Sequence, residues 1–233
     1  MYCHSCGTQL SPDVQFCPVC GRSLGGSPPP VAPPVYAPGG AAIAPMITPG
    51  AWIGAGWRIV EADLGNFILL ALVYILLNAM VPFILKGPLA AGFHIYCLKG
   101  MLGRRPEFQD LFKGFNFFVP ALVASLLIVL FTSLGALLCI IPGLVVAAMY
   151  MFTYLFIVDK RMDFWQAMQA SHNLVRNDYF AFTMFFLLII LINLLGVLCC
   201  VVGVLVSLPV SVAATTVAYQ QLVGFDPRTP DSV

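Results

Sequence analysis

GFNFFVPALVASLLIVLFTSLGALLCIIPGLVVAAMYMFTYLFIV, residues 114–158, contains no charged side chain along 45 residues. One crossing of a bilayer needs about 20 mostly apolar residues, and a helix of this length would extend for about 70 Å. The pair Pro142–Gly143, in the second half of the stretch, is expected to break such a helix. The stretch therefore predicts two membrane-spanning helices joined as a hairpin.

Two further apolar stretches lie on either side of this one. Residues 179–225 form an uncharged run of 47 residues in which Gly203 and Pro209 predict a second break, and hence a second hairpin. Residues 64–85 form an uncharged run of 22, enough for one span. The remaining segment, 86–103, is shorter and less apolar, and it decides between five and six spans.

The placement of basic residues favours six spans. With six, both termini and the loops 99–113 and 159–178 lie on one side of the membrane. That side then holds all of the 11 Lys and Arg residues except Lys86. An excess of Lys and Arg marks the cytoplasmic side. We therefore expect an all-α polytopic membrane domain of about six helices at 51–225 and a cytoplasmic tail at 226–233.

The overall composition agrees with a lipid environment. The chain is 60% hydrophobic and 9% charged, whereas soluble domains carry about 25% charged residues. Such a chain needs the lipid bilayer as its partner to cover its surface. The net charge of +1 does not favour nucleic acid as a partner.

The first 24 residues carry a metal-binding pattern. Two CxxC pairs, each followed by a glycine, provide four thiols: Cys3, Cys6, Cys17 and Cys20. Four thiolates at this spacing suit a tetrahedral zinc ion and leave no open position for catalysis. Residues 1–24 resemble the short zinc ribbons found at the N-terminus of many bacterial proteins. We expect structural Zn²⁺; two disulfides or a metal-free ribbon are the alternatives, and a cytoplasmic protein partner or a mere folding module are both open.

A proline-rich linker follows the ribbon. The stretch 24–50 contains eight prolines, five glycines and no charge. Proline at this density favours an extended chain over helix and sheet. We therefore expect residues 25–50 to tether a ribbon that folds separately from the membrane domain.

Amphipathic segments are predicted before each hairpin. Each has apolar side chains at helical spacing, which would suit a helix in the headgroup plane. The three sets are Trp57, Val60, Leu64 and Phe67; Phe108, Leu111, Phe112 and Phe115; and Trp165, Met168, His172 and Val175. Their recurrence indicates three degenerate units of one interface helix and one hairpin, with chance similarity of apolar sequence as the alternative.

Polar side chains within the predicted spans mark the candidate intramembrane site. No Asp or Glu lies at membrane depth, and the prominent polar residues are Asn78, His94 and Asn193. Such side chains line a solute site in some proteins, and in others they only join neighbouring helices. No metalloprotease, serine hydrolase or nucleotide-binding motif occurs in the sequence, so we expect no enzymatic activity.

The segments GPLAAGFHIYCLKGMLGRRPEFQDLFKGF (87–115) and IIPGLVVAAMYMF (140–152) carry a family resemblance. They resemble a group of uncharacterised bacterial multi-pass proteins, and the membrane half of membrane-anchored glycerophosphodiester phosphodiesterases. The resemblance covers about residues 55–225 and implies a place in the bacterial cytoplasmic membrane. The catalytic barrel of the phosphodiesterases is absent, so hydrolysis is not implied.

These features favour a non-enzymatic membrane protein with a scaffolding, regulatory or assembly role, in which the ribbon docks a partner. The alternative is a transporter or channel for a small or lipid-like solute, because internal repeats and broken helices are common in transporters. A polar cavity lined by Asn78, His94 or Asn193 would favour the alternative. The sequence leaves the oligomeric state open.

Overall fold

The computed structural model describes residues 48–81, 84–226 and 229. The chain divides into two compact units, 1–44 and 45–233, and every described residue belongs to the second. The predicted ribbon at 1–24, its four cysteines and nearly all of the predicted linker therefore lie outside the described residues. So does most of the predicted tail at 226–233.

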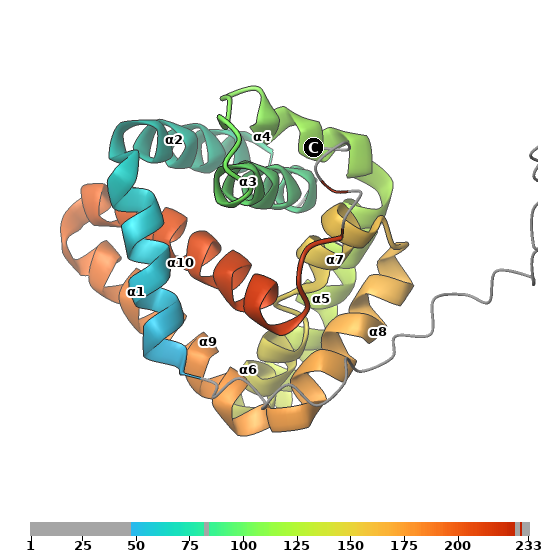
Figure 1. The fold of residues 1–233 in the computed structure, drawn as a ribbon. Helices are drawn as coiled ribbons and strands as arrows, with labels where there is room; N and C mark the ends of the chain where they lie inside the picture. Colours follow the sequence, from blue (N-terminus) through green and yellow to red (C-terminus); the bar gives the residue numbers. More distant parts are fainter. Residues whose placement is uncertain (1–47, 82–83, 227–228, 230–233) are drawn as a thin grey trace, which may run out of the picture. The chain divides into compact units, whose positions relative to one another are not determined.

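The described residues form helices and no strand (Figure 1). There are ten α-helices in this part of the chain: α1 (Pro49–Ala62), α2 (Leu64–Met80), α3 (Lys86–Met101), α4 (Asp110–Lys113), α5 (Phe118–Leu138), α6 (Ile140–Met149), α7 (Thr153–Lys160), α8 (Phe164–Val175), α9 (Tyr179–Leu198) and α10 (Cys200–Leu222). Short 3-10 turns at Gly114–Phe117 and Arg176–Asp178 join α4 to α5 and α8 to α9. The helical domain begins at Pro49, slightly before the predicted boundary at residue 51.

In the part of the chain that the structure describes, four helical segments are long and apolar enough to cross a membrane: Asp110–Leu137, Ile140–Lys160, Phe164–Leu198 and Val202–Leu222. A fifth is obtained if α1 and α2 count as one bent span. The membrane protein class is therefore supported by the structure. The predicted count of six would also require α2, with 17 residues, and α3, with 16, to cross separately.

The hairpin turns lie a few residues before the predicted breaks. The chain turns at Cys139, between α5 and α6, and at Cys199, between α9 and α10. Pro142 occupies the first turn of α6, where a missing backbone N–H costs no helical hydrogen bond. Pro209 lies inside α10, which continues through it. The two hairpins were thus predicted correctly, but the proline positions did not locate their turns.

The first predicted amphipathic helix is divided in two. The axes of α1 and α2 differ by 101° at Asp63, so Trp57 and Val60 lie on a different helix from Leu64 and Phe67. The Asp63 carboxylate accepts hydrogen bonds from the Asn66 side chain, at 2.9 Å from both oxygens, in the first turn of α2. A single face over residues 57–67 was therefore a wrong prediction, because helical spacing continued across a break that the apolar pattern did not reveal.

The other two predicted amphipathic segments differ from each other in continuity. The segment Phe108–Phe115 crosses a turn, the four-residue α4 and part of a 3-10 turn. In α8, Met168 and Val175 are buried and Trp165 is half exposed. Only the third segment is a continuous helix, and its place in the headgroup plane stays a prediction.

The last helix, α10, is the centre of the packing. It contacts α1 and α9 extensively, and also α2 and α3 (Figure 1). The Trp52 indole of α1 donates a 2.7 Å hydrogen bond to the Gln221 side chain of α10, and a Cβ at Gly56 would overlap the Ala214 backbone. The helices α1 and α10 therefore lie in direct contact. Helix α1 is packed as part of the bundle and is not a separate helix at its periphery.

Candidate functional site

Asn78, the first of the three predicted intramembrane polar residues, bonds to its own helix. Its side-chain amide donates a 2.9 Å hydrogen bond to the carbonyl of Tyr74, one turn earlier in α2. This contact pairs one N–H of the amide within α2 and involves neither a second helix nor a ligand. Asn78 lines neither of the two cavities described below.

His94 joins α3 to α10. Its ring is 6% exposed, and Nδ1 lies 3.1 Å from the Thr216 hydroxyl. That hydroxyl already donates its single proton to the Val212 carbonyl at 2.9 Å. It must therefore accept from His94, which assigns the proton of a neutral imidazole to Nδ1. His94 is thus a buried contact between two helices, as one of the two sequence interpretations held.

Asn193 makes the most extensive polar contact between two helices of the three. Its amide nitrogen donates to the Ile189 carbonyl in α9 at 2.8 Å and to the Ser211 hydroxyl in α10 at 2.7 Å. Its oxygen accepts from Ser207 at 3.1 Å. The whole amide is therefore used in joining α9 to α10, which agrees with the role of intramembrane asparagines as interhelical contacts.

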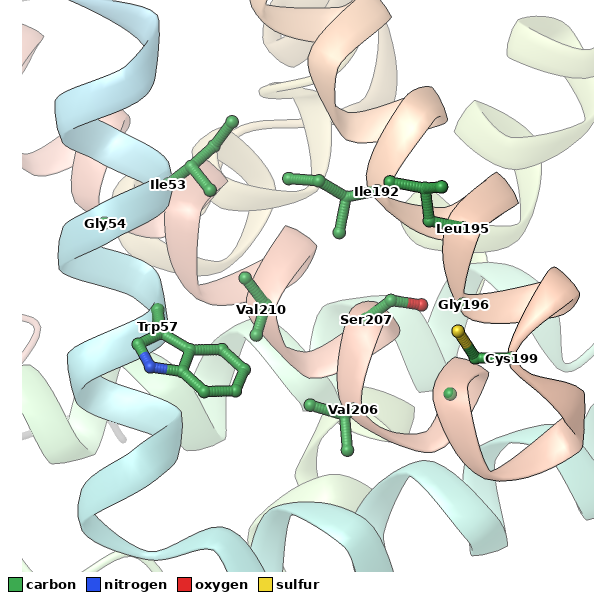
Figure 2. A pocket seen from close by; sticks show the side chains of 11 residues that line it. Ile53, Gly54, Trp57, Ile192, Leu195, Gly196, Cys199, Val206, Ser207 and Val210 are labelled. Atoms are coloured by element: carbon green, nitrogen blue, oxygen red, sulfur yellow. The ribbon is translucent and has the colours of Figure 1, made fainter.

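A cavity of about 480 Å³ lies between α1, α9 and α10. Figure 2 shows Ile53 and Trp57 entering it from α1, and Val206, Ser207 and Val210 from α10. The wall on α9 consists of Ile192, Leu195, Gly196 and Cys199. The Ser207 hydroxyl points toward α9, in the direction of its bond to Asn193. The lining is therefore apolar, suited to hydrocarbon, and the three predicted polar residues are not brought together in it.

The Asp110 cluster consists of Asp110, Lys99 and Lys113, and it was not among the sites predicted from the sequence. Asp110 at the start of α4 is 1% exposed, and its Oδ1 lies 2.8 Å from Lys99 Nζ and 2.9 Å from Lys113 Nζ. Its Oδ2 accepts from the Glu107 amide at 2.7 Å. A Cβ at Gly92 would overlap the Leu111 carbonyl, so α3 approaches the start of α4 closely enough for Lys99 to reach Asp110.

The Asp159 cluster consists of Asp159, Lys160, Tyr219, Asp226 and Thr229. The Asp159 carboxylate, in the last turn of α7, accepts from the Tyr219 hydroxyl at 2.8 Å and from the Asp226 amide at 3.1 Å. The Thr229 hydroxyl also donates to it, and Lys160 Nζ lies 3.3 Å away. Gly224, with φ of 75°, turns the chain after α10 toward this carboxylate. The start of the predicted tail is therefore attached to α7.

Both aspartates could have been found from one sequence signal. Each lies beside an uncharged run: Asp110 just before 114–158, and Asp159 directly after it. A carboxylate at the end of an apolar helix is held where the backbone leaves the membrane, and it needs a partner when it is buried. The basic residues of these loops favoured a topology, but their number alone does not reveal which carboxylates they pair with.

Among the described residues, no group of three or more His, Cys, Asp or Glu side chains could hold a metal ion. The predicted zinc ligands lie in the part of the chain outside that description. Cys97, within α3, is a buried free thiol. Cys139 and Cys199, at the two hairpin turns, are exposed free thiols.

The comparison with known protein families identifies the N-terminal segment. The zinc-ribbon domain family matches residues 2–24, which include all four predicted ligands. This match establishes a zinc-ribbon domain at the N-terminus. It covers the ribbon only and gives no information on residues 25–233.

The chain is similar to uncharacterized mycobacterial proteins. One from Mycobacterium bovis and one from Mycobacterium tuberculosis are each 31% identical to the chain over 157 residues. The match covers 67% of this chain and 46% of each relative, so the chain spans about half the length of these curated relatives. No solved structure matches the chain. Neither relative bears a phosphodiesterase name, so the resemblance to the phosphodiesterase membrane half finds no support in them.

Proposed function

We propose that this chain is a non-enzymatic protein of the bacterial cytoplasmic membrane with a scaffolding, regulatory or assembly role. In this proposal Cys3, Cys6, Cys17 and Cys20 hold structural Zn²⁺ in a cytoplasmic ribbon, and the ribbon docks a cytoplasmic protein. Four thiolates complete a tetrahedral zinc site, so the metal would fold the ribbon without taking part in chemistry.

The use of the intramembrane polar side chains is the observation that carries the proposal. Asn78 bonds within α2, His94 bonds to Thr216, and Asn193 bonds to Ser207 and Ser211. The Asn193 amide is fully used in helix contacts, Asn78 and His94 each make one such contact, and none of the three lines either of the two cavities. Such side chains hold a bundle together, as an assembly protein requires.

A pull-down from membranes tests the docking role. Full-length protein and its Cys17→Ser variant would be captured through the same C-terminal tag, and the bound proteins compared. Ser5→Ala is the matched control, because it changes a residue between two ligands without removing a thiol. We expect one or more proteins bound by the unaltered chain and by Ser5→Ala to be lost with Cys17→Ser. Identical sets of bound proteins for all three would refute docking by the ribbon.

Transport of a lipid-like solute is the second candidate, and the apolar cavity between α1, α9 and α10 favours it. Its volume of about 480 Å³ and its hydrocarbon lining would suit an acyl chain. Val210→Trp would fill the cavity from α10, and Leu198→Trp, on an exposed position of α9, is a control of equal size. Movement of a fluorescent lipid between vesicle leaflets that slows only with Val210→Trp would support transport over scaffolding.

The topology belongs to the same proposal: six spans, with both termini and the loops 99–113 and 159–178 in the cytoplasm. The excess of Lys and Arg in these loops supports it. Single cysteines introduced at Arg105 and Arg161 would be treated with a membrane-impermeant maleimide, in a chain whose exposed Cys139 and Cys199 are replaced by serine. We expect labelling only after the cells are opened. Labelling of either position in intact cells would refute the six-span arrangement.

A further inference from the structure

A second cavity, of about 340 Å³, lies between the start of α3, the middle of α5, the α6–α7 junction and α9. Its lining differs in chemistry from that of the first. It combines one ammonium group and five hydroxyl groups with an apolar wall. The polar side chains are Lys86, Ser125, Thr132, Ser133, Tyr150 and Tyr154.

Lys86 contributes the only positive charge of this cavity's lining. Within the described residues, none of the ion pairs includes Lys86; the lysines that are paired there are Lys99, Lys113 and Lys160. No carboxylate lines the cavity either. Within the described residues this ammonium group has no counter-ion, which leaves a dissolved anion or a bound ligand to balance its charge.

The packing of α3 on α5 places this ammonium group beside the interior of a span. A Cβ at Gly87 would overlap the Ala121 carbonyl, so the start of α3 lies against the first turns of α5. The rest of α5, Leu122–Leu138, extends about 25 Å further at 1.5 Å per residue. The cavity residues Ser125 to Ser133 lie within the candidate span Asp110–Leu137. Lys86 is exposed and lines this cavity together with residues of that span, so its ammonium group is accessible to a ligand there.

Two further features indicate room for a polar ligand. The Thr132 hydroxyl is buried and has no hydrogen-bond partner, and a buried hydroxyl without a partner is costly. The helix on the opposite wall is interrupted between Met149 and Thr153, and Tyr150 and Met151 of this interruption line the cavity. Helices broken at membrane depth are typical of ligand sites, because backbone there is tolerated where it lines a cavity.

We propose that this cavity binds an anionic amphiphile, with its negatively charged oxygen group on Lys86 and its hydrocarbon chain along Ile128, Val129, Met151 and Phe186. The hydroxyls of Thr132 and Tyr154 donate to the same oxygens. The ligand supplies the missing negative charge, and the apolar wall distinguishes a lipid from a small free anion. None of its lining residues lines the cavity of Figure 2.

Native mass spectrometry of the full chain, released from detergent after titration with phosphatidylglycerol or phosphatidylcholine, tests the proposal. We expect retention of phosphatidylglycerol over phosphatidylcholine. Lys86→Gln should weaken that retention by about tenfold or more, as loss of a charged hydrogen bond does. Lys86→Arg should preserve it. Arg105→Gln, which removes an exposed charge outside the cavity, should leave it unchanged.

The outcomes separate the sources of the anion. Displacement of phosphatidylglycerol by inorganic phosphate at equal concentration would refute the amphiphile and indicate a site for a free anion. Equal retention by Lys86→Gln and the unaltered chain would overturn the site itself. Thr132→Val, which removes only the unpartnered hydroxyl, should weaken retention by about two- to tenfold; stronger retention in this variant would contradict the assigned hydrogen bond.

Discussion

Asp110 and Asp159 are both buried carboxylates at the ends of helices, yet their surroundings differ. Asp110 is held by two ammonium groups, Lys99 and Lys113, at 2.8 and 2.9 Å. Asp159 accepts hydrogen bonds from the neutral donors of Tyr219, Asp226 and Thr229, and among the described residues Lys160 is the cation adjacent to it. The first arrangement compensates charge with charge, and the second spreads one charge over hydrogen bonds.

The difference indicates two tasks. The Asp110 cluster joins α3 to α4, which are close in sequence, and a lysine that is 9% exposed depends on it. The Asp159 cluster joins α7 to a segment about 60 to 70 residues later in the chain. We therefore expect loss of Asp110 to cost mainly stability, and loss of Asp159 to release mainly the C-terminal segment.

Asp110→Ala should have the largest effect. It leaves Lys99 buried without its carboxylate, and breaking a buried ion pair costs about 3–5 kcal/mol. Unfolding of the bundle by denaturing detergent, followed by its helical circular dichroism, measures the loss. Glu107→Ala is the control, because this exposed side chain takes no part in the ion pairs of the described residues. Equal losses for the two variants would show that the charge pairing is unimportant.

The double variant Lys99→Met with Asp110→Leu sharpens this result. Replacing a buried ion pair by apolar side chains of similar size is often neutral or stabilising. We expect the double variant to recover most of the stability that Asp110→Ala loses. Lys113, whose side chain is 41% exposed, remains solvated in this variant. A double variant as unstable as Asp110→Ala would mean that the cluster acts through its geometry and not through the buried charge.

Asp159→Asn should have an intermediate effect, because the amide keeps the size but weakens the hydrogen bonds to a charged acceptor. Such bonds contribute about 1.5–3 kcal/mol each. We expect the amide hydrogen of Asp226 to exchange faster, measured by hydrogen–deuterium exchange with mass spectrometry. Asp110→Ala should not change that exchange when measured under conditions in which the bundle stays folded. Faster exchange in both variants would show that the two clusters are coupled.

Lys113→Gln should have a small effect. This lysine is separated from Asp110 by one helical turn and is partly exposed, so solvent screens the pair. Exposed pairs of this kind contribute at most about 1 kcal/mol. The same unfolding assay should place Lys113→Gln close to the unaltered chain and Lys99→Gln well below it. The reverse order would mean that exposure does not distinguish the two lysines.

Removal of zinc should leave both clusters unchanged, since they lie within the unit 45–233 and the ribbon lies within the unit 1–44. Metal binding supplies most of the folding free energy of so short a ribbon. We expect a chelator to unfold residues 1–24 and to leave the thermal midpoint of the detergent-solubilised bundle unchanged. A large fall of that midpoint on chelation would refute a ribbon that folds independently.

The sequence predicted the class of the fold because uncharged runs and basic loops report directly on the membrane. It located the hairpins but not their turns, since Pro142 fits the first turn of α6 and Pro209 is accommodated inside α10. It did not predict the bend at Asp63, because the apolar spacing of α1 continues into α2.

The candidate site was predicted less well, for a physical reason. Asn78, His94 and Asn193 were selected for their polarity, but polarity does not reveal which helix lies opposite each one. That depends on close approaches such as Gly56 to Ala214 and Gly87 to Ala121. The cavity that Lys86 and Ser125 both line could not be predicted from the sequence either, because these residues are far apart in the chain.

The contact between α1 and α10 has a consequence for how the protein is made. Trp52 bonds to Gln221, which follows it by 169 residues. At the usual rate of translation, about 5–20 residues per second, the ribosome adds those residues in roughly 10–30 s. Throughout that time the buried face of α1, with Trp52, Gly56 and Val60, lacks its partner helix. The membrane insertion machinery, a chaperone or surrounding lipid must therefore shelter the first helix until the last one is synthesised.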